Sequence, residues 1–338
     1  MAPAKLCVIA ECGVNHNGSL ALALELVDRA AAAGADAVKF QTFRPEALVS
    51  RGARKAAYQM AAIGGADSQL EMLESLALTE ADHHAIRQRC ESRSIEFMST
   101  PFDESSCDLL ERVGVSRFKI ASGDLTHLTF LRYVAARGLP VILSTGMATL
   151  AEVEAAVAAI AAGGNPPLTL LHCVTEYPAP IEQVNLRAIE TLRRAFGLPV
   201  GYSDHTVGSE AAIAAVALGA TTIERHLTLD RSLPGPDHKA SAEPGELRDL
   251  IGTLRGVQLA LGDGVKRPAP CELGNRDVAR RSLVAVRSLR AGERLTRALV
   301  AVKRPAAGIQ PGDLDKAMGL RLSVDVEADT PITWDMLK

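Results

Sequence analysis

Short apolar runs alternate with longer segments of helical spacing along most of the chain, and most runs end in polar residues. Apolar positions that recur every three to four residues predict helices, whereas short continuous runs bounded by turn residues predict buried strands. The continuous runs predict eight strands, at 6–10, 37–41, 95–99, 117–121, 140–143, 168–172, 198–203 and 220–224. The segments of helical spacing predict helices at 20–33, 46–62, 68–76, 80–93, 104–113, 128–137, 150–161, 186–196, 209–218 and 244–261.

This alternation of strands and helices predicts an α/β protein with a (β/α)8 TIM barrel. An open, doubly wound sheet is the rival architecture. No G-x-G-x-x-G follows the first predicted strand, which counts against the dinucleotide-binding version of that rival.

The pattern changes after residue 262, where glycine and proline become frequent. We expect a barrel domain at 1–262, a linker at 263–275 and a small module at 276–338 with short β-like runs at 282–286 and 299–302. A module this small needs packing partners. Lys303-Arg304-Pro305 forms a basic tip on it, with a plain surface turn as the alternative interpretation.

Composition narrows the class of partner. A formal charge of −3 and 4% aromatic residues argue against a nucleic-acid binder or a membrane-surface binder. The six cysteines include no C-x-x-C pair, and the N-terminus lacks the apolar stretch of a signal peptide. We therefore expect a cytoplasmic protein with reduced thiols.

Polar side chains gather where the predicted strands end. Parallel strands of a barrel end at one rim, and barrel active sites are built from that rim. The residues expected there are Glu11, Lys39, Gln41, Thr100, Lys119, Ser122, Ser144, Tyr177, Ser203, His205 and His226.

Two kinds of chemistry follow from these residue types. Lys39 and Lys119 with several hydroxyl groups suit a phosphate or carboxylate ligand, because buried lysines need an anion. The alternative is a lysine–carboxylate pair inside the barrel, formed with Glu11 or Asp124. His205 and His226 end successive strands, so their imidazoles would be neighbours that suit a divalent metal; two unrelated rim histidines are the alternative. Asp237 lies in a loop across the rim.

Several motifs then resemble the sialic acid synthase family, which condenses phosphoenolpyruvate with N-acylated mannosamine-type sugars. They are IAECGVNHNG, VKFQTF, STPFDE, KIASGD, STGMAT, LLHCVTEYPAP, GYSDHT, IERHLTLD and PGPDHKAS. SLVAVRSLRAGERLT and VKRPAAGI resemble the antifreeze-like (SAF, β-clip) domain fused to these enzymes. The resemblance covers nearly the whole chain, and it implies a homodimer with swapped C-terminal domains.

The resemblance also implies roles for individual residues. Lys39, Thr100, Lys119, Ser122, Ser144 and Ser203 fall on phosphoenolpyruvate-binding positions. His205 and His226 fall on the ligands of a divalent ion, manganese with magnesium or cobalt as alternatives. Gln41, Tyr177, Asp237 and Arg304 fall on sugar-contacting positions, and Arg304 would come from the partner's tail. Glu11, also sugar-contacting, and Asp124 are the candidate groups for proton transfer.

The acceptor stays open at this point. A family asparagine that contacts the sugar falls near Gly65 here. The acceptor could therefore be N-acetylmannosamine, a legionaminate-type diacetamido-trideoxymannose, a pseudaminate-type altrose derivative or a 6-phosphorylated sugar. A catalytically silent sugar-binding protein is the alternative from another class, and the intact lysine and histidine pairs argue against it.

Overall fold

The computed structural model describes residues 5–50, 52–55, 60 and 68–338, and it divides them into two compact units. The first unit extends to Asp263 and the second runs from Gly264 to Lys338. Within the described residues, no helix is long and apolar enough to cross a membrane.

Eight parallel strands form the centre of the first unit. Their order is β3-β2-β1-β8-β7-β6-β5-β4, and the two end strands lie next to each other, so the sheet nearly closes into a barrel. The predicted barrel is confirmed. The strands are β1 Cys7–Glu11, β2 Ala37–Thr42, β3 Glu96–Pro101, β4 Phe118–Ile120, β5 Val141–Ser144, β6 Leu168–Cys173, β7 Val200–Asp204 and β8 Thr222–His226.

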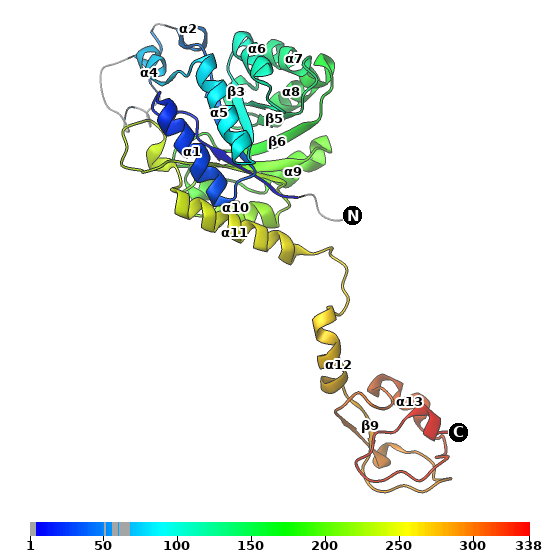
Figure 1. Ribbon diagram of the computed structural model, residues 1–338. Helices are drawn as coiled ribbons and strands as arrows, with labels where there is room; N and C mark the ends of the chain where they lie inside the picture. Colours follow the sequence, from blue (N-terminus) through cyan, green and yellow to red (C-terminus); the bar gives the residue numbers. More distant parts are fainter. Residues whose placement is uncertain (1–4, 51, 56–59, 61–67) are drawn as a thin grey trace. The chain divides into compact units, whose positions relative to one another are not determined.

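Helices surround the strands (Figure 1). Several begin at a capping box, such as the one that Ser68 and Glu71 form at α4. The helices of this unit are α1 Leu20–Ala33, α2 Pro45–Leu48, α4 Gln69–Leu76, α5 Glu80–Ser92, α6 Glu104–Val113, α7 Leu128–Ala135, α8 Leu150–Gly163, α9 Ala188–Phe196, α10 Glu210–Ala217 and α11 Pro244–Leu261. Short 3-10 turns lie at η1 Ser122–Asp124, η2 Ile181–Gln183 and η3 His238–Ala240.

The helix expected over residues 46–62 is not continuous in the part that the structure describes. Helix α2 ends at Leu48, Val49 is extended, and residues 50 and 52–55 are not helical, whereas Met60 is helical again. Ser50 and Gly52 favour turns over helix, which explains the early end.

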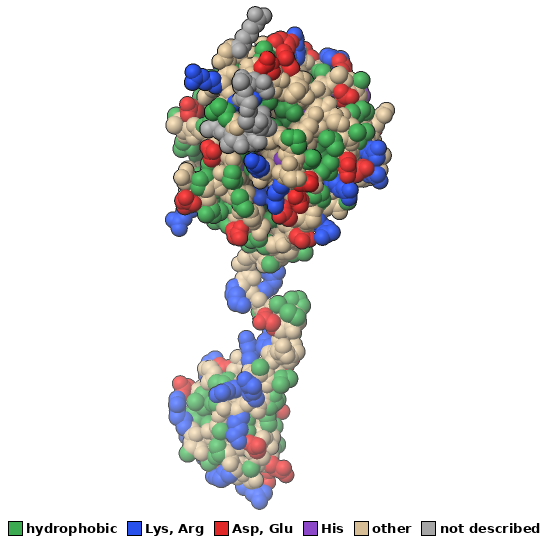
Figure 2. Space-filling model, turned by 90° about the vertical axis from the view of Figure 1, so that its left-hand side faces the viewer, with side chains coloured by type: hydrophobic (Ala, Val, Ile, Leu, Met, Phe, Trp, Pro, Cys, Tyr) green, Lys and Arg blue, Asp and Glu red, His purple; other side chains and the backbone are tan. Residues whose placement is uncertain are grey.

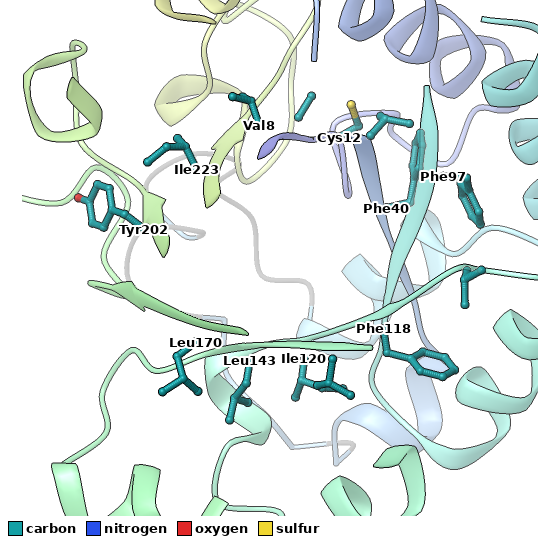
Figure 3. Close-up of a cluster of buried hydrophobic side chains, with 14 of the residues drawn as sticks. Val8, Cys12, Phe40, Phe97, Phe118, Ile120, Leu143, Leu170, Tyr202 and Ile223 are labelled. Carbon is teal, nitrogen blue, oxygen red and sulfur yellow. The ribbon is translucent and has the colours of Figure 1, made fainter. Parts of the chain in front are cut away.

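The apolar core lies between the strands and the helices. Strand side chains alternate between two faces, and the outward set is almost wholly apolar. Figure 3 shows ten of these residues directed away from the barrel interior: Val8, Cys12, Phe40, Phe97, Phe118, Ile120, Leu143, Leu170, Tyr202 and Ile223. The outer surface differs, because acidic and basic side chains are interspersed on the face of this unit seen in Figure 2.

The second unit has its own small core. Strands β9 Ser282–Ala285 and β10 Val300–Lys303 pair antiparallel, close to the two β-like runs expected there. The helical segments are η4 Pro270–Glu272, α12 Leu273–Ala279, η5 Arg297–Leu299, η6 Pro311–Asp313, α13 Leu314–Ala317 and η7 Trp334–Met336. Helix α12 thus begins inside the stretch expected to be linker.

Candidate active site

The barrel interior changes from apolar to polar along the strands. One interior layer consists of apolar side chains from five strands: Ile9, Ala37, Met98, Ile142 and Leu171. Two residues further on, the same faces carry Glu11, Lys39, Thr100, Ser144 and Cys173, because side chains two apart in a strand share a face. The fold therefore places a polar layer over an apolar floor, at the carboxyl ends of the strands.

A cavity of about 230 Å³ opens on this polar layer. Twelve of the fourteen predicted site residues line it, which are Glu11, Lys39, Gln41, Thr100, Lys119, Ser122, Ser144, Tyr177, Ser203, His205, His226 and Asp237. Buried polar atoms without a hydrogen-bond partner in the described structure also gather here. They are Ser144 Oγ, Thr175 Oγ1, Glu224 Oε2 and His226 Nδ1. Unsatisfied buried groups are costly, so their concentration in one cavity points to a polar ligand.

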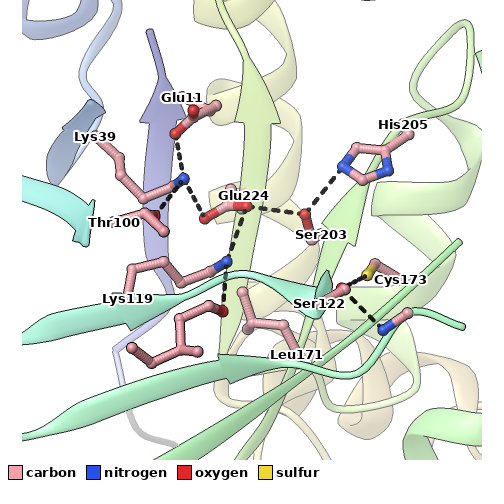
Figure 4. Close-up of polar contacts among 12 residues, drawn as sticks. Glu11, Lys39, Thr100, Lys119, Ser122, Leu171, Cys173, Ser203, His205 and Glu224 are labelled. Carbon is pink, nitrogen blue, oxygen red and sulfur yellow. Dashed lines mark hydrogen bonds and ion pairs between the residues drawn. The ribbon is translucent and has the colours of Figure 1, made fainter. Parts of the chain in front are cut away.

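Four buried charges form the centre of the cavity (Figure 4). Lys39 Nζ lies 2.5 Å from Glu11 Oε2 and 3.8 Å from Glu224 Oε2. Lys119 Nζ lies 3.6 Å from Glu224 Oε1. Lys39 also donates to Thr100 Oγ1 at 3.2 Å. The internal lysine–carboxylate pair, given above as the alternative, is thus present between Lys39 and Glu11, and both lysines also line the cavity.

The surroundings shift the pKa values of these groups in different directions. Burial raises the pKa of Glu11 to about 7, although Lys39 opposes this. For Glu224, burial also acts to raise the pKa, but the Lys119 and Lys39 ammonium groups outweigh it and lower the pKa to about 2. Glu224 is therefore a fixed anion, whereas Glu11 exchanges a proton near neutral pH.

Three aromatic rings meet at the other side of the cavity. The rings of His205 and His226 have their centroids 5.4 Å apart, and the Tyr177 ring lies 4.2 Å from that of His205. Burial lowers the pKa of both histidines, so both imidazoles are neutral. His205 Nδ1 lies 2.7 Å from the Val174 carbonyl oxygen, and because a carbonyl only accepts, Nδ1 carries the proton. Ser203 Oγ lies 3.3 Å from His205 Nε2 but donates its hydrogen to Glu224 at 2.9 Å, so the Nε2 lone pair is available to a ligand.

This donor set fits a divalent metal. Neutral imidazoles are common metal ligands, and a carbonyl that fixes the tautomer through the other ring nitrogen is a frequent support. His226 Nδ1 has no hydrogen-bond partner among the described residues and lies 3.8 Å from Asp237 Oδ2. No group of three or more His, Cys, Asp or Glu side chains in the described ranges forms a metal-binding cluster. The described residues therefore offer a metal two imidazole ligands.

The loop that carries Asp237 is held by residues that follow β1. Asn15 Nδ2 donates to Ser241 Oγ at 2.8 Å, and Ser241 Oγ donates to the Asp237 carbonyl at 2.7 Å. The His238 ring, fully buried, contacts Thr228 Oγ1 at 2.7 Å. These bonds fix the backbone of the loop and so place the Asp237 carboxyl, whose pKa burial raises to about 7.

Two predicted site residues lie elsewhere. Asp124 belongs to the turn η1 and is not among the cavity-lining residues, and burial raises its pKa to about 6. Arg304 is an exposed residue of the second unit. The position near Gly65, where a family asparagine was expected, lies outside the described residues.

Glu224 is the residue that sequence reasoning missed, because it was treated only as the end of a strand. It accepts a hydrogen bond from Ser203 Oγ at 2.9 Å and lies between both lysines. The alternation of side chains along the strand could have identified it, because Glu224 and His226 are two residues apart and share the interior face.

Taken together, the barrel and its polar cavity define the class as a (β/α)8 enzyme with its site at the carboxyl ends of the strands. The model of the NeuB family matches residues 26–266, and the model of the SAF domain matches residues 280–338. The chain belongs to the NeuB family, the sialic and legionaminic acid synthases.

Individual relatives agree with this family. The chain is 45% identical to the N,N'-diacetyllegionaminic acid synthase of Legionella pneumophila over 98% of this chain and 94% of that protein. It is 46% identical to the enzyme of the same name from Campylobacter jejuni, over 93% of this chain and 95% of that protein. A crystal structure of an N-acetylneuraminic acid synthetase from Leptospira borgpetersenii in complex with citrate superposes with a TM-score of 0.73 at 36% identity, covering 80% of this chain and 90% of that one.

Proposed function

We propose that this chain condenses phosphoenolpyruvate with an open-chain, diacetamido-trideoxymannose-type sugar, giving a nine-carbon 2-keto acid of the legionaminate type and phosphate. The observation that carries the proposal is the cavity that joins a lysine and hydroxyl cluster to two neutral imidazoles. The names of the 45% and 46% identical relatives support the acceptor.

The lysine and hydroxyl cluster would hold phosphoenolpyruvate. Lys39 and Lys119 supply two ammonium groups for the phosphate and the carboxylate. The hydroxyl donors of the same cavity complete the pocket, and they are Thr100, Ser122, Ser144 and Ser203. Such positioning brings the alkene carbon to the acceptor at a high effective concentration.

The histidine side of the cavity would hold a divalent ion and the sugar. A divalent ion held by His205 and His226 would supply Lewis-acid chemistry at the aldehyde oxygen of the acceptor. Gln41, Tyr177 and Asp237 line the cavity nearby and would orient the sugar by its hydroxyl groups.

The reaction joins the alkene carbon of phosphoenolpyruvate to the aldehyde carbon, water adds at the carbon that bears the phosphate, and the C–O bond to phosphate breaks. Glu11 would move the protons, because its pKa near 7 and its bond from Gln41 Nε2, at 3.1 Å, place an exchangeable carboxyl in the cavity. Asp124, outside the cavity lining, is the weaker candidate for this role.

The second unit enters the proposal through Arg304. A guanidinium suits the neutral N-acyl carbonyl of the sugar as a hydrogen-bond donor, and Arg304 is exposed on the small unit. We infer a homodimer with swapped C-terminal units, in which each Arg304 completes the site of the other copy.

The test supplies phosphoenolpyruvate, manganese and a panel of acceptors, and it measures phosphate release and the mass of the product. A chelator should abolish turnover, and His226→Ala should lose both bound metal and activity, whereas the exposed His84→Ala on α5 should retain both. Full activity of metal-free protein would contradict the metal assignment. If no acceptor in the panel supports the consumption of phosphoenolpyruvate, the synthase proposal is left without support.

A further inference from the structure

One wall of the cavity is apolar, in contrast to its charged centre. Val14, Met72, Leu73, Leu76 and Phe102 line it alongside the charged residues. The three α4 residues are 6–8% exposed, and with Val14 and Phe43 they form one apolar cluster. Phe102 packs edge-on against Phe43, with ring centroids 6.2 Å apart. The wall is therefore a packed surface and not a set of loose side chains.

The structure holds this wall in a fixed place. Leu76 lies three residues after Leu73 and four after Met72, which are the spacings that share a helix face, and all three line the cavity. The helix begins at Ser68, whose hydroxyl accepts from the Glu71 N–H at 3.2 Å while the Glu71 carboxylate accepts from the Ser68 N–H at 2.8 Å.

The Phe102 end of the wall lies across the site from His205. Phe102 follows β3 and His205 follows β7, which is four strands away in the order of the eight-stranded barrel, whereas Val14 follows β1, which pairs with the β8 strand of His226. Both wall residues come after their strand ends, so they lie further toward the mouth than the lysine layer. An acceptor with its aldehyde at the histidines would extend its other end toward α4.

We propose that Met72, Leu73, Leu76 and Phe102 determine which acceptor is used, by contacting apolar groups at the end of the sugar remote from the aldehyde. The groups that fit are a deoxy carbon and the methyl of an N-acyl substituent. A hydroxyl or a phosphoryl group at that end finds no donor or charge among the described residues of this wall. This inference rests on the proposed function, and it excludes 6-phosphorylated acceptors.

The size of the effect follows from the chemistry of the wall. An apolar pocket rejects a ligand that adds one hydroxyl by about 100-fold at most, so a preference of about 10- to 100-fold is expected over N-acetylmannosamine. A phosphoryl dianion beside this wall would be buried without a counter-charge, which is far more costly than a hydroxyl. Turnover of N-acetylmannosamine 6-phosphate should therefore be undetectable.

The test compares kcat/KM for three acceptors at saturating phosphoenolpyruvate. They are 2,4-diacetamido-2,4,6-trideoxymannose, N-acetylmannosamine and N-acetylmannosamine 6-phosphate. Leu73→Gln gives the wall a hydrogen-bonding group and should reduce the preference for the first sugar by about 10-fold. The KM for phosphoenolpyruvate should not change. Leu70→Gln is the matched control, because Leu70 is on the same helix but does not line the cavity.

The outcomes separate this inference from the proposed function. If the wild-type enzyme uses N-acetylmannosamine or its 6-phosphate as well as the trideoxy sugar, the wall does not select and the inference is overturned while the synthase proposal stands. If Leu73→Gln and Leu70→Gln change the preference equally, the inference also fails. Should Leu73→Gln unfold at a lower temperature, the nearly isosteric Met72→Gln gives the same comparison. Failure of every acceptor overturns the synthase proposal itself.

Discussion

Replacing Glu224 by glutamine should destabilise the barrel unit more than any single change at a surface ion pair. The side chain is almost fully buried, and its carboxylate lies 3.6 Å from Lys119 Nζ and 3.8 Å from Lys39 Nζ. Glutamine keeps the size and an oxygen for the Ser203 hydroxyl but removes the charge. Breaking a buried ion pair by removing one partner costs about 3–5 kcal/mol.

The lower end of that range is expected at neutral pH, because only one lysine is left without a carboxylate. Lys39 retains Glu11 at 2.5 Å, whereas Lys119 retains only the Ile120 carbonyl among its described polar contacts, at 3.3 Å. Burial already lowers the pKa of Lys119, and the loss of Glu224 should lower it further. Raising the pH removes the uncompensated proton, so the destabilisation should shrink at alkaline pH.

The assay is urea unfolding followed by far-ultraviolet circular dichroism at pH 7 and at alkaline pH. The only tryptophan, Trp334, is in the second unit, so its fluorescence is an internal control that should not shift. Glu96→Gln is the matched variant, since its partner Arg117, at 2.7 Å, is partly exposed and such pairs contribute about 0–1 kcal/mol. Inorganic phosphate should stabilise Glu224→Gln more than the wild type. A Glu224→Gln variant no less stable than Glu96→Gln would refute the reasoning.

Three further predictions concern other parts of the chain. Burial would raise the pKa of Asp36, but hydrogen bonds from Lys5, the Val8 N–H and Arg255 outweigh it and lower the pKa. Asp36→Asn should therefore lower the urea midpoint at pH 7, and the difference from the wild type should shrink as the pH falls through the lowered pKa of the folded state. Gly146→Ala should impair phosphoenolpyruvate binding, measured as KM, since the added Cβ would lie 2.8 Å from two cavity side chains; an unchanged KM would show that the cavity adjusts. If the units are swapped, inactive Arg304→Ala and Lys119→Ala subunits should regain partial activity when mixed, and verified subunit exchange without activity would contradict the swap.

The barrel could be predicted from sequence because each strand is a short apolar run that ends in a polar residue. The rim positions followed from the same pattern, since the carboxyl ends of parallel strands must meet. Asp124 lies outside the cavity lining for a local reason, because from Ser122 onward the chain forms the turn η1 and its side chains no longer follow strand alternation. The helix expected over 46–62 is interrupted after Leu48, because the turn preference of Ser50 and Gly52 outweighs the apolar spacing there.

Contacts between strands distant in sequence could be predicted only in part. The Lys39–Glu11 pair, which joins β2 to β1, was one of the alternatives given from the sequence, whereas the Lys119–Glu224 pair joins β4 to β8, which do not pair in the sheet, and was not expected. Which carboxylate meets which ammonium group depends on how the interior layers stack. The apolar wall was also missed, because Met72, Leu73 and Leu76 have the spacing of any helix face buried in a core.

The charge balance of the cavity explains why an anion and a divalent ion would bind there together. Lys39 and Lys119 are already offset by Glu11 and Glu224, so the cavity holds no surplus positive charge for a phosphate and a carboxylate. An added anion needs new positive charge or the loss of a negative charge. Glu11, with a pKa raised to about 7, loses its negative charge when it takes up a proton. A divalent ion held by the neutral imidazoles of His205 and His226 would add positive charge. In the proposed reaction, phosphoenolpyruvate should therefore bind more tightly with the metal than without it, and its binding should be accompanied by proton uptake.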